Sequence, residues 1–420
     1  MPDLPLPVPD AERPAILDWV EAHLGMLCCD PVAPSRSFVG GQSAADGALA
    51  ALDIADYASA RNEVHPVAAR GASRLSPYIR HGLLPLPDVW DRVAEAPSYD
   101  RFRYQGELLW QDYARHWYAL HGSATREAIA YEPAQSTASW DPDPWWRSMA
   151  CIDRTLTELE TDGWCVNQTR MWLASQYTVR GHGRWRDGED HLFTHLLDGS
   201  RAANRLGWQW TIGGTRPKAH GFARPQVTKR APAFCQECAL RDRCPIAGYA
   251  RSVEQRKRER PPVLDPATAY GPVEAPTAGT GSGAADPEAV WLTAESLGHA
   301  DPALSAHPEL PVWFVFDRAL LHRLQLSSKR LVFLTETLAE LAQTRTVHLW
   351  LGDPVTVIGA TPVAVTFAPV PGFRQRVARL TDPTLHPWPW LRPPTEELLA
   401  RLAITGRAPS FREFCRVTKP

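Results

Sequence analysis

The stretch HLFTHLLDGSRAANRLGWQW (191–210) is the most informative part of this sequence. It joins the acidic turn Asp198-Gly199-Ser200 to Ala-Ala-Asn and then to two tryptophans, Trp208 and Trp210. A buried Asn204 would offer both a donor and an acceptor to a heteroaromatic ring. Taken alone, the two tryptophans are better explained as ordinary core residues. The stretch therefore indicates a ligand site only if other parts of the chain support it.

A second polar stretch, RGASRLSPYIRHG (70–82), places Ser73 and Ser76 around Arg74. Hydroxyls beside a guanidinium can bind a phosphate. Ser73 can equally well cap a helix, and for this stretch alone capping is the simpler interpretation.

The composition excludes several classes of protein. The 420 residues carry 45 basic and 47 acidic side chains, which fits neither a polycation nor an acidic disordered chain. No apolar run reaches the eighteen residues of a transmembrane helix. The first residues, MPDLPLPVPDAERP (1–14), lack the basic and apolar regions of a secretory signal. We therefore expect a cytoplasmic protein, and a monomer.

Three of the eight cysteines form a metal-binding pattern in AFCQECALRDRCP (233–245). Cys235 and Cys238 make a C-x2-C pair, and Cys244 follows six residues later. Zinc and iron–sulfur clusters both need four ligands, so a fourth must come from elsewhere. The alternative is three structural or incidental cysteines. The candidates for the fourth ligand are Cys28, Cys29, Cys151, Cys165 and Cys415.

The apolar periodicity predicts two domains that differ in class. Residues 1–270 are helical, and residues 271–287 form a flexible linker with four Gly, three Pro and four Ala. Residues 288–420 alternate buried strands with helices, which indicates a Rossmann-like α/β domain with a parallel sheet. The expected helices are 15–26, 44–61, 103–120, 149–161, 167–177, 331–342 and a helical region over 394–417; the expected strands are 289–292, 312–316 and 347–351.

Five motifs together resemble the FAD-binding domain of the photolyase/cryptochrome family. They occur in the family's order over roughly residues 35–250: ASRLSPYIRHGLL, ELLWQDYARHW, GWCVNQTRMWLAS, GRWRDGEDHLFTHLLDG and AANRLGWQW. The resemblance implies an FAD site in which Asn204 faces flavin N5, and in which Ser200 replaces the second Asp of the family's Asp-Gly-Asp. The implied FAD-binding residues are Tyr57, Ser73, Arg74, Leu75, Ser76, Asn167, Arg170, Asp198, Ser200 and Asn204.

The resemblance also implies catalytic residues. Trp208 would be the first electron donor to the photoexcited flavin and Trp185 the next, with Trp140, Trp145 or Trp146 as a third. On the substrate side, Glu107 and Trp110 occupy the positions of the carboxylate and aromatic that contact a pyrimidine dimer. Asn167 and Met171 resemble the pocket of cyclobutane-dimer enzymes.

Cys151, in SMACIDRTL (148–156), resembles a ligand of the family's bacterial iron–sulfur branch. The resemblance therefore implies that Cys151, Cys235, Cys238 and Cys244 hold a [4Fe-4S] cluster. The loop between the last two ligands is shorter than in that branch, which keeps zinc open.

The domain order resembles a circular permutation of the family. AVWLTAESLGHADPALSAH (289–307) is similar to the opening strand and loop of the antenna domain, which precedes the FAD domain in the family. The alternative is an unrelated α/β domain added by fusion. An antenna chromophore of unknown identity would belong to this domain.

The function implied by the resemblance is light-driven repair of UV-damaged DNA by a deoxyribodipyrimidine photolyase. Reduced FAD would split cyclobutane dimers flipped out of the duplex. Residues 224–260 hold ten Lys/Arg against four Asp/Glu, which favours phosphate contacts. The alternatives are a (6-4) photolyase of the iron–sulfur branch and a cryptochrome-like photosensor without repair activity.

Overall fold

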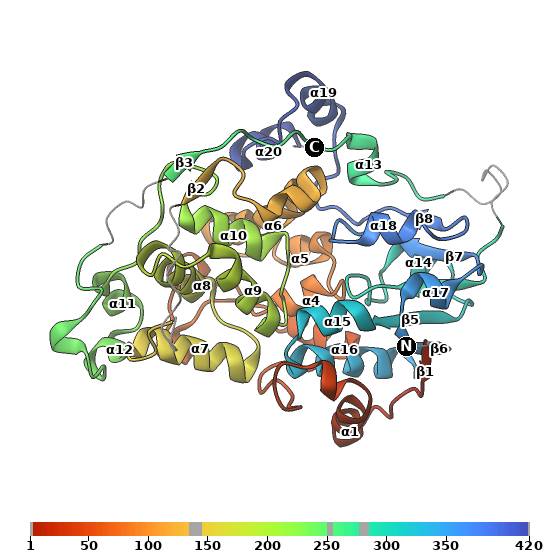
Figure 1. Ribbon diagram of the computed structural model, residues 1–420, viewed down its shortest axis with the longest axis horizontal. Coiled ribbons are helices and arrows are strands. Elements are labelled where there is room, and N and C mark those ends of the chain that lie inside the picture. The colour runs from red at the N-terminus through yellow and green to blue at the C-terminus, as the bar shows by residue number, and fades with distance from the viewer. Residues whose placement is uncertain (1–2, 134–144, 250–254, 277–284, 419–420) are drawn as a thin grey trace.

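The computed structural model describes residues 3–133, 145–249, 255–276 and 285–418 of the chain. A helical unit and an α/β unit lie side by side (Figure 1). This is the predicted fold class, an all-helical part followed by a doubly wound parallel sheet. In the part of the chain that the structure describes, no helix is long and apolar enough to cross a membrane.

The sheet of the α/β unit has the strand order β1-β6-β5-β4-β7-β8. The strands from β4 to β8 are parallel, and β1 pairs antiparallel with β6 at the edge. Every residue of β4 and β7 is buried, as expected for central strands of a parallel sheet covered on both faces. The bounds are β1 Leu4–Leu6, β4 Ala289–Leu292, β5 Val312–Asp317, β6 Val347–Gly352, β7 Val363–Thr366 and β8 Thr384–His386.

The helices of the α/β unit flank these strands. They include α16, in which every residue from Ser328 to Ala339 is buried. The bounds are α14 Pro302–Ala306, α15 Arg318–Leu324, α16 Ser328–Leu341, α17 Pro354–Ile358 and α18 Phe373–Val377.

The helical unit is built around α6, the longest helix described. A small two-stranded sheet, β2 Tyr131–Pro133 with β3 Gln255–Lys257, lies beside it. The helices are α2 Gln42–Ala50, α3 Tyr57–Ala60, α4 Ser76–Arg80, α5 Leu86–Arg92, α6 Ser98–His121, α7 Ala150–Asp162, α8 Asn167–Ala174, α9 Trp185–His195, α10 Ala203–Ile212, α11 Arg224–Arg230, α12 Pro232–Gln236 and α13 Pro266–Tyr270; short 3-10 turns are Gly25–Leu27, Val67–Ala69, Gly122–Arg126 and Arg241–Arg243.

Three predicted helices are interrupted. The helix expected over 44–61 divides into α2, which ends at Ala50, and α3, which begins after Asp56, a residue with φ 61°. The helix expected over 167–177 changes at Ser175 into a π-helix, Ser175–Arg180. The last helical region divides into α19 Glu396–Thr405 and α20 Phe411–Val417, since Gly406 has φ 58°.

Both ends of the chain cross to the other unit. At the N-terminus, β1 belongs to the sheet, and α1 Arg13–Leu24 packs against α16. At the C-terminus, α20 packs against α6, where the ring of Phe414 lies 5.5 Å from that of Tyr113. The predicted boundary at residue 270 places the N-terminal segment in the helical unit and the C-terminal helices in the α/β unit. In the structure each segment packs with the other unit.

The two units share one hydrophobic core. Tyr78 of α4 and Phe333 of α16 are in ring contact at 5.8 Å. Nearby, the backbone at Gly40 lies so close to α16 that a Cβ there would be 2.0 Å from the carbonyl oxygen of Phe333. The region before α2 therefore depends on a glycine for its approach to the other unit.

We expect Gly40→Ala to lower the free energy of unfolding by about 1–3 kcal/mol, because the added methyl group overpacks this contact. The matched control is Gly47→Ala in α2, where a Cβ meets nothing within 4 Å. The control removes a helix glycine and should be neutral or stabilising by up to about 1 kcal/mol. Urea unfolding of both variants measures the difference, and equal stabilities would contradict the close-contact explanation.

Candidate functional site

The centre of the predicted flavin site is a buried ion pair between α8 and the loop after α9. Arg170 donates from Nη1 to Asp198 Oδ1 at 3.0 Å and from Nη2 to Oδ2 at 2.8 Å. Its Nε donates to the carbonyl oxygen of Cys165 at 2.9 Å. Burial acts to lower the pKa of Arg170, but the Asp198 carboxylate and Cys165 outweigh it, so the pKa is raised. Arg170 therefore stays charged, and its two hydrogen bonds to Asp198 fix the loop that begins there.

Ser200 and Asn204 hold that loop against the start of α10. The Ser200 hydroxyl accepts hydrogen bonds from the amides of Ala202 and Ala203. The amide of Ser200 in turn donates to Asn204 Oδ1. The NH2 group of Asn204 is thus its remaining hydrogen-bonding group, a donor suited to a flavin nitrogen or carbonyl. Ser200 caps the turn here, which explains how the loop forms without a second Asp.

The turn that precedes α4 brings the predicted phosphate-binding residues together. Arg74 has φ 60°, and its guanidinium lies 4.9 Å from the ring of Phe38 and 5.5 Å from that of Trp164. Ser76 Oγ accepts a hydrogen bond from Trp164 Nε1 at 3.0 Å, while Leu75 is buried. The Arg74 side chain is 42% exposed, and its nearest carboxylate oxygen is 3.9 Å away. A guanidinium with exposed donors beside two hydroxyls has the chemistry that binds a pyrophosphate.

Tyr57 and Ser73 both contact Tyr104 of α6. The rings of Tyr57 and Tyr104 meet edge-on at 4.9 Å, and Tyr104 is hydrogen-bonded to Ser73. Burial raises the pKa of Tyr104 to about 12, so its hydroxyl remains a donor at neutral pH. These contacts join α3, the turn before α4 and α6 into one wall.

The predicted substrate residues lie on α6 and α8. Glu107 pairs with Arg61 and is 39% exposed. Asn167 is exposed at the start of α8, and Met171 is partly exposed one turn later. Trp110 is partly buried because its ring lies 5.1 Å from that of Phe411 in α20, a contact made by the far end of the chain.

The two predicted electron donors are buried between α9 and α10. Trp208 is 3% exposed and donates from Nε1 to Thr178 Oγ1 at 3.3 Å, and Trp185 is 2% exposed. Gly188 allows α9 to approach, since a Cβ there would meet the Trp208 ring at 2.6 Å. Sequence reasoning missed one aromatic, Tyr177 of the π-helix.

Tyr177 lies between Trp208 and Trp145. Its ring is 6.4 Å from that of Trp208 and 4.6 Å from that of Trp145. Trp145 is buried, whereas Trp146 is 46% exposed. Trp140, the remaining candidate for the third tryptophan, lies outside the described residues. The sequence offers one weak indication of Tyr177: it follows the polar residues Ser175 and Gln176 at the end of the predicted helix 167–177.

All four predicted metal ligands line one pocket between α7, α11 and the loop after α12. They are Cys151, Cys235, Cys238 and Cys244. Burial, and after it the charges of the other three thiols, raises the pKa of Cys151 to about 12. Thr228 donates to Cys235 Sγ at 3.5 Å, and the amide of Leu240 donates to Cys238 Sγ at 3.4 Å. The structure thus brings together the set that the spacing and the resemblance indicate.

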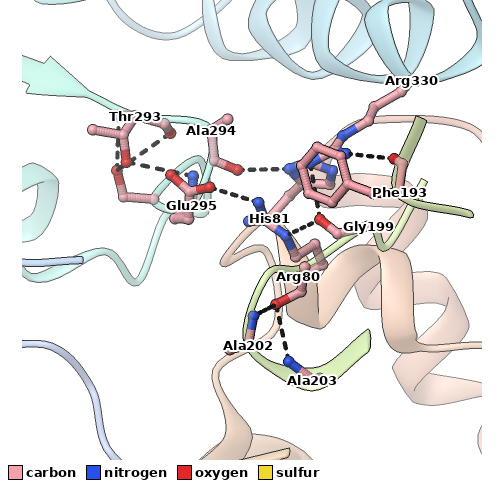
Figure 2. Close-up of polar contacts among 12 residues, drawn as sticks. Arg80, His81, Phe193, Gly199, Ala202, Ala203, Thr293, Ala294, Glu295 and Arg330 are labelled. Carbon is pink, nitrogen blue, oxygen red and sulfur yellow. Dashed lines mark hydrogen bonds and ion pairs between the residues drawn. The ribbon is translucent and has the colours of Figure 1, made fainter. Parts of the chain in front are cut away.

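The flavin loop also contacts the α/β unit, a connection that the sequence does not reveal. Figure 2 shows Arg80 and Arg330 converging on Gly199. Arg80 Nε and Arg330 Nη2 donate to its carbonyl oxygen at 2.7 and 3.0 Å. Arg330 Nη1 donates to the carbonyl oxygen of Phe193 at 3.4 Å, and Arg80 pairs with Glu295 at 2.6 Å. Burial, and after it Arg80, lowers the pKa of Arg330 to about 9, so the guanidinium is still charged at neutral pH.

His81 completes this interface from α4. Its ring nitrogens lie 2.6 Å from the carbonyl oxygen of Ala294 and 3.0 Å from that of Leu197. The loop after β4 and the loop after α9 are therefore held on the two sides of one buried imidazole (Figure 2).

Comparison with known proteins identifies the helical unit. Residues 104–231, from α6 to α11, match the family model described as the FAD binding domain of DNA photolyase. The chain is 29% identical over 181 residues to the deoxyribodipyrimidine photo-lyase of Streptomyces griseus, covering 41% of this chain and 39% of that protein. It is 31% identical over 187 residues to the enzyme of that name from Synechococcus, covering 39% and 37%.

A bacterial class III photolyase structure from Agrobacterium tumefaciens is 21% identical, with a TM-score of 0.40 over 55% of this chain and 48% of that one. The segment from α6 to α11 is similar to the flavin-binding domain of DNA photolyase on the strength of the family-model match. The chain spans less than half the length of the curated relatives named here, which are 29% and 31% identical to it over the matched residues.

We expect Arg330→Met to lower the free energy of unfolding by about 1–3 kcal/mol, because it removes the charged donor of the Phe193 carbonyl and one donor of Gly199. Since Gly199 adjoins Asp198, the variant should also release FAD more readily. Arg323→Met, at an exposed position of α15, is the control. Thermal unfolding measures the stability, and the FAD content of the purified protein measures flavin retention. Unchanged FAD retention in Arg330→Met would show that the contact of Arg330 with Gly199 does not affect flavin binding.

Proposed function

We propose that this protein is a light-dependent DNA repair enzyme, a deoxyribodipyrimidine photolyase that splits cyclobutane pyrimidine dimers. The observation that carries the proposal is that Asp198, paired with Arg170, and Asn204, bonded to the Ser200 amide, adjoin one loop, with Trp208 one turn further along α10. Exposed Asn167 and Glu107 lie on the two helices that adjoin this loop in the family's arrangement.

FAD, when bound in its reduced form and excited by light, supplies one electron to the dimer and recovers it after the ring has split. The chain's own residues position both partners. Arg170 and Asp198 fix the loop that would hold the flavin, and Arg74 with Ser73 and Ser76 would hold its pyrophosphate. Glu107 accepts hydrogen bonds from the flipped pyrimidines, and Trp110 supplies an apolar face for them.

Bound flavin would be reduced by electrons passed along buried aromatic side chains. Trp208 would be the first donor and Trp185 the second, as the resemblance implies. Ring contacts support a branch from Trp208 through Tyr177 to Trp145. Of the candidates for the third tryptophan, we therefore assign the role to Trp145.

The four clustered cysteines are proposed to hold a [4Fe-4S] cluster. A single tetrahedral zinc ion with Zn–S bonds of about 2.3 Å would bring its sulfurs to about 3.8 Å from one another. Among the residues that the structure describes, no three of these four thiols gather within 4.8 Å. The larger cluster needs wider spacing, and hydrogen bonds to its thiolates, like those to Cys235 and Cys238, tune its potential.

DNA is the proposed partner, through basic side chains of residues 224–260. Arg243, Arg256, Lys257 and Arg260 are exposed and able to contact phosphates. Arg230 and Arg258 are instead held in ion pairs within the protein.

The α/β unit is proposed to be a relocated antenna domain. The strands after the linker have the order 3-2-1-4-5 in their own sequence, with β4 at the centre, which is a doubly wound sheet. The resemblance implies an antenna chromophore in this domain, and its identity is open.

The deciding experiment is repair of a defined lesion. The purified protein, reduced and illuminated with blue light, should restore an oligonucleotide that carries a cyclobutane thymine dimer, and it should leave a (6-4) product unchanged. Reversed-phase chromatography of the oligonucleotide measures both, because a lesion and its repaired form have equal mass but different retention. Restoration of the (6-4) product would favour the (6-4) photolyase, and light-induced flavin reduction with no repair of either lesion would favour a photosensor.

We expect Trp208→Phe to abolish flavin photoreduction while FAD stays bound, since an inert ring of similar shape replaces an oxidisable indole. Trp145→Phe and Tyr177→Phe should each slow photoreduction if the branch carries electrons. Trp313→Phe, in β5 of the α/β unit, is the control. Absorbance of the flavin under illumination, with an external reductant, gives the rates; unchanged rates in both branch variants would leave Trp185 as the second donor.

A further inference from the structure

Three side chains with different donor atoms meet where the N-terminal segment, α9 and α16 come together. Cys29 and Asp30 follow the turn Gly25–Leu27, and His195 is the last residue of α9. One ligand atom from each, a sulfur, a carboxylate oxygen and an imidazole nitrogen, all lie within 4.8 Å of one another. This group is separate from the cysteines that line the pocket beside α7.

The backbone holds the three segments in this arrangement. The amide of Cys29 donates to the carbonyl oxygen of Leu326 at 3.2 Å, and the amide of Ser327 donates to that of Thr194 at 2.9 Å. Both bonds are made by residues adjoining the side chains of interest. The donor atoms are thus placed by main-chain contacts before any ligand binds, which reduces the entropy lost on binding.

Asp30 is fixed as well. Its Oδ1 accepts from the amide of Ser328 at 2.7 Å. Its Oδ2 accepts from Ser327 Oγ at 2.9 Å and from Lys329 Nζ at 2.8 Å. A carboxylate oxygen has two lone pairs, so Asp30 retains a position for a further partner.

His195 supplies the second, independent observation. Its Nδ1 atom is buried and has no hydrogen-bond partner among the described residues. A buried nitrogen in this state costs about 1–3 kcal/mol. A metal ion bound by these three residues would offset the cost of burying the His195 imidazole.

We propose that Cys29, Asp30 and His195 bind a Zn²⁺ ion. Sulfur, imidazole nitrogen and carboxylate oxygen are the ligand types that zinc accepts together, whereas Ca²⁺ and Mg²⁺ select oxygen. Cys29 binds as the thiolate and releases its proton to solvent. Because Cys29 is exposed, water completes the tetrahedron. The thiolate and Asp30 carry two negative charges, Lys329 returns one, and the ion meets a net charge of −1.

The site ties the N-terminal segment and both units of the protein at one point. The proposal does not depend on the repair function, because none of the three residues belongs to the flavin or dimer site. The proposed zinc site and the proposed [4Fe-4S] site share no ligand. An experiment can therefore contradict one of these proposals without affecting the other.

The full-length protein, purified anaerobically with FAD, is equilibrated with Zn²⁺ and dialysed against metal-free buffer, and metals are then measured by mass spectrometry. We expect one zinc per chain in the wild type. Cys29→Ser and His195→Asn should bind zinc at least about 100-fold more weakly, since even loss of an outer-shell contact costs up to that factor. Cys28→Ser is the matched control, because this neighbouring thiol is outside the group. Cys235→Ser should lose iron and keep the zinc.

A measurement without variants complements the first. Zn²⁺ should slow alkylation of Cys29 in the wild-type protein without changing the rate at Cys28, as read by peptide fragmentation. Failure of the wild type to retain zinc, equal retention in Cys29→Ser, or zinc lost with Cys235→Ser instead of Cys29→Ser would each overturn the proposal. Equal protection of Cys28 and Cys29 would also overturn it.

Discussion

The buried guanidinium of Arg330 is the interaction on which the rest of this structure depends. An arginine of the α/β unit donates to the carbonyl oxygens of Phe193 and Gly199 in the helical unit. Removing such a charge from water costs several kcal/mol, which the fold offsets with these acceptors and with the Phe193 ring 4.8 Å away. The loop that carries Asp198 is consequently shaped by both units, and neither unit alone presents the complete site.

Most secondary structure was predictable because it rests on local periodicity. The runs 289–292, 312–316 and 347–351 are short, apolar and β-branched or aromatic, and each is a strand within one residue of its expected end. The breaks within helices were not predictable in the same way. Gly406 ends α19 in a left-handed backbone conformation, and Asp56 takes one just before α3; hydrophobic periodicity encodes neither.

Site residues that belong to a recognisable motif were predictable from the sequence. Residues that reach the site only because distant segments meet in the fold were missed. The four cysteines were gathered from two stretches 84 residues apart only because a family resemblance pointed to Cys151. Tyr177 and Arg330 escaped notice for a different reason. Tyr177 lies in a π-helix that places it between two tryptophans, and the sequence pattern does not indicate a π-helix. Arg330 lies in a largely apolar helix, and nothing in the sequence indicates that it binds a carbonyl group about 130 residues earlier.

The pairing of β1 with β6 has a consequence for how the protein is made. Leu4 lies opposite Leu351, so β1 waits for a partner strand that is synthesised about 350 residues later. At the usual rates of translation that interval is roughly 20 to 70 seconds. Throughout it the apolar face of α1, with Ile16, Val20 and Leu24, lacks α16 as its cover. A nascent chain of this design offers chaperones the uncovered α1 as a binding segment until α16 and the sheet have formed.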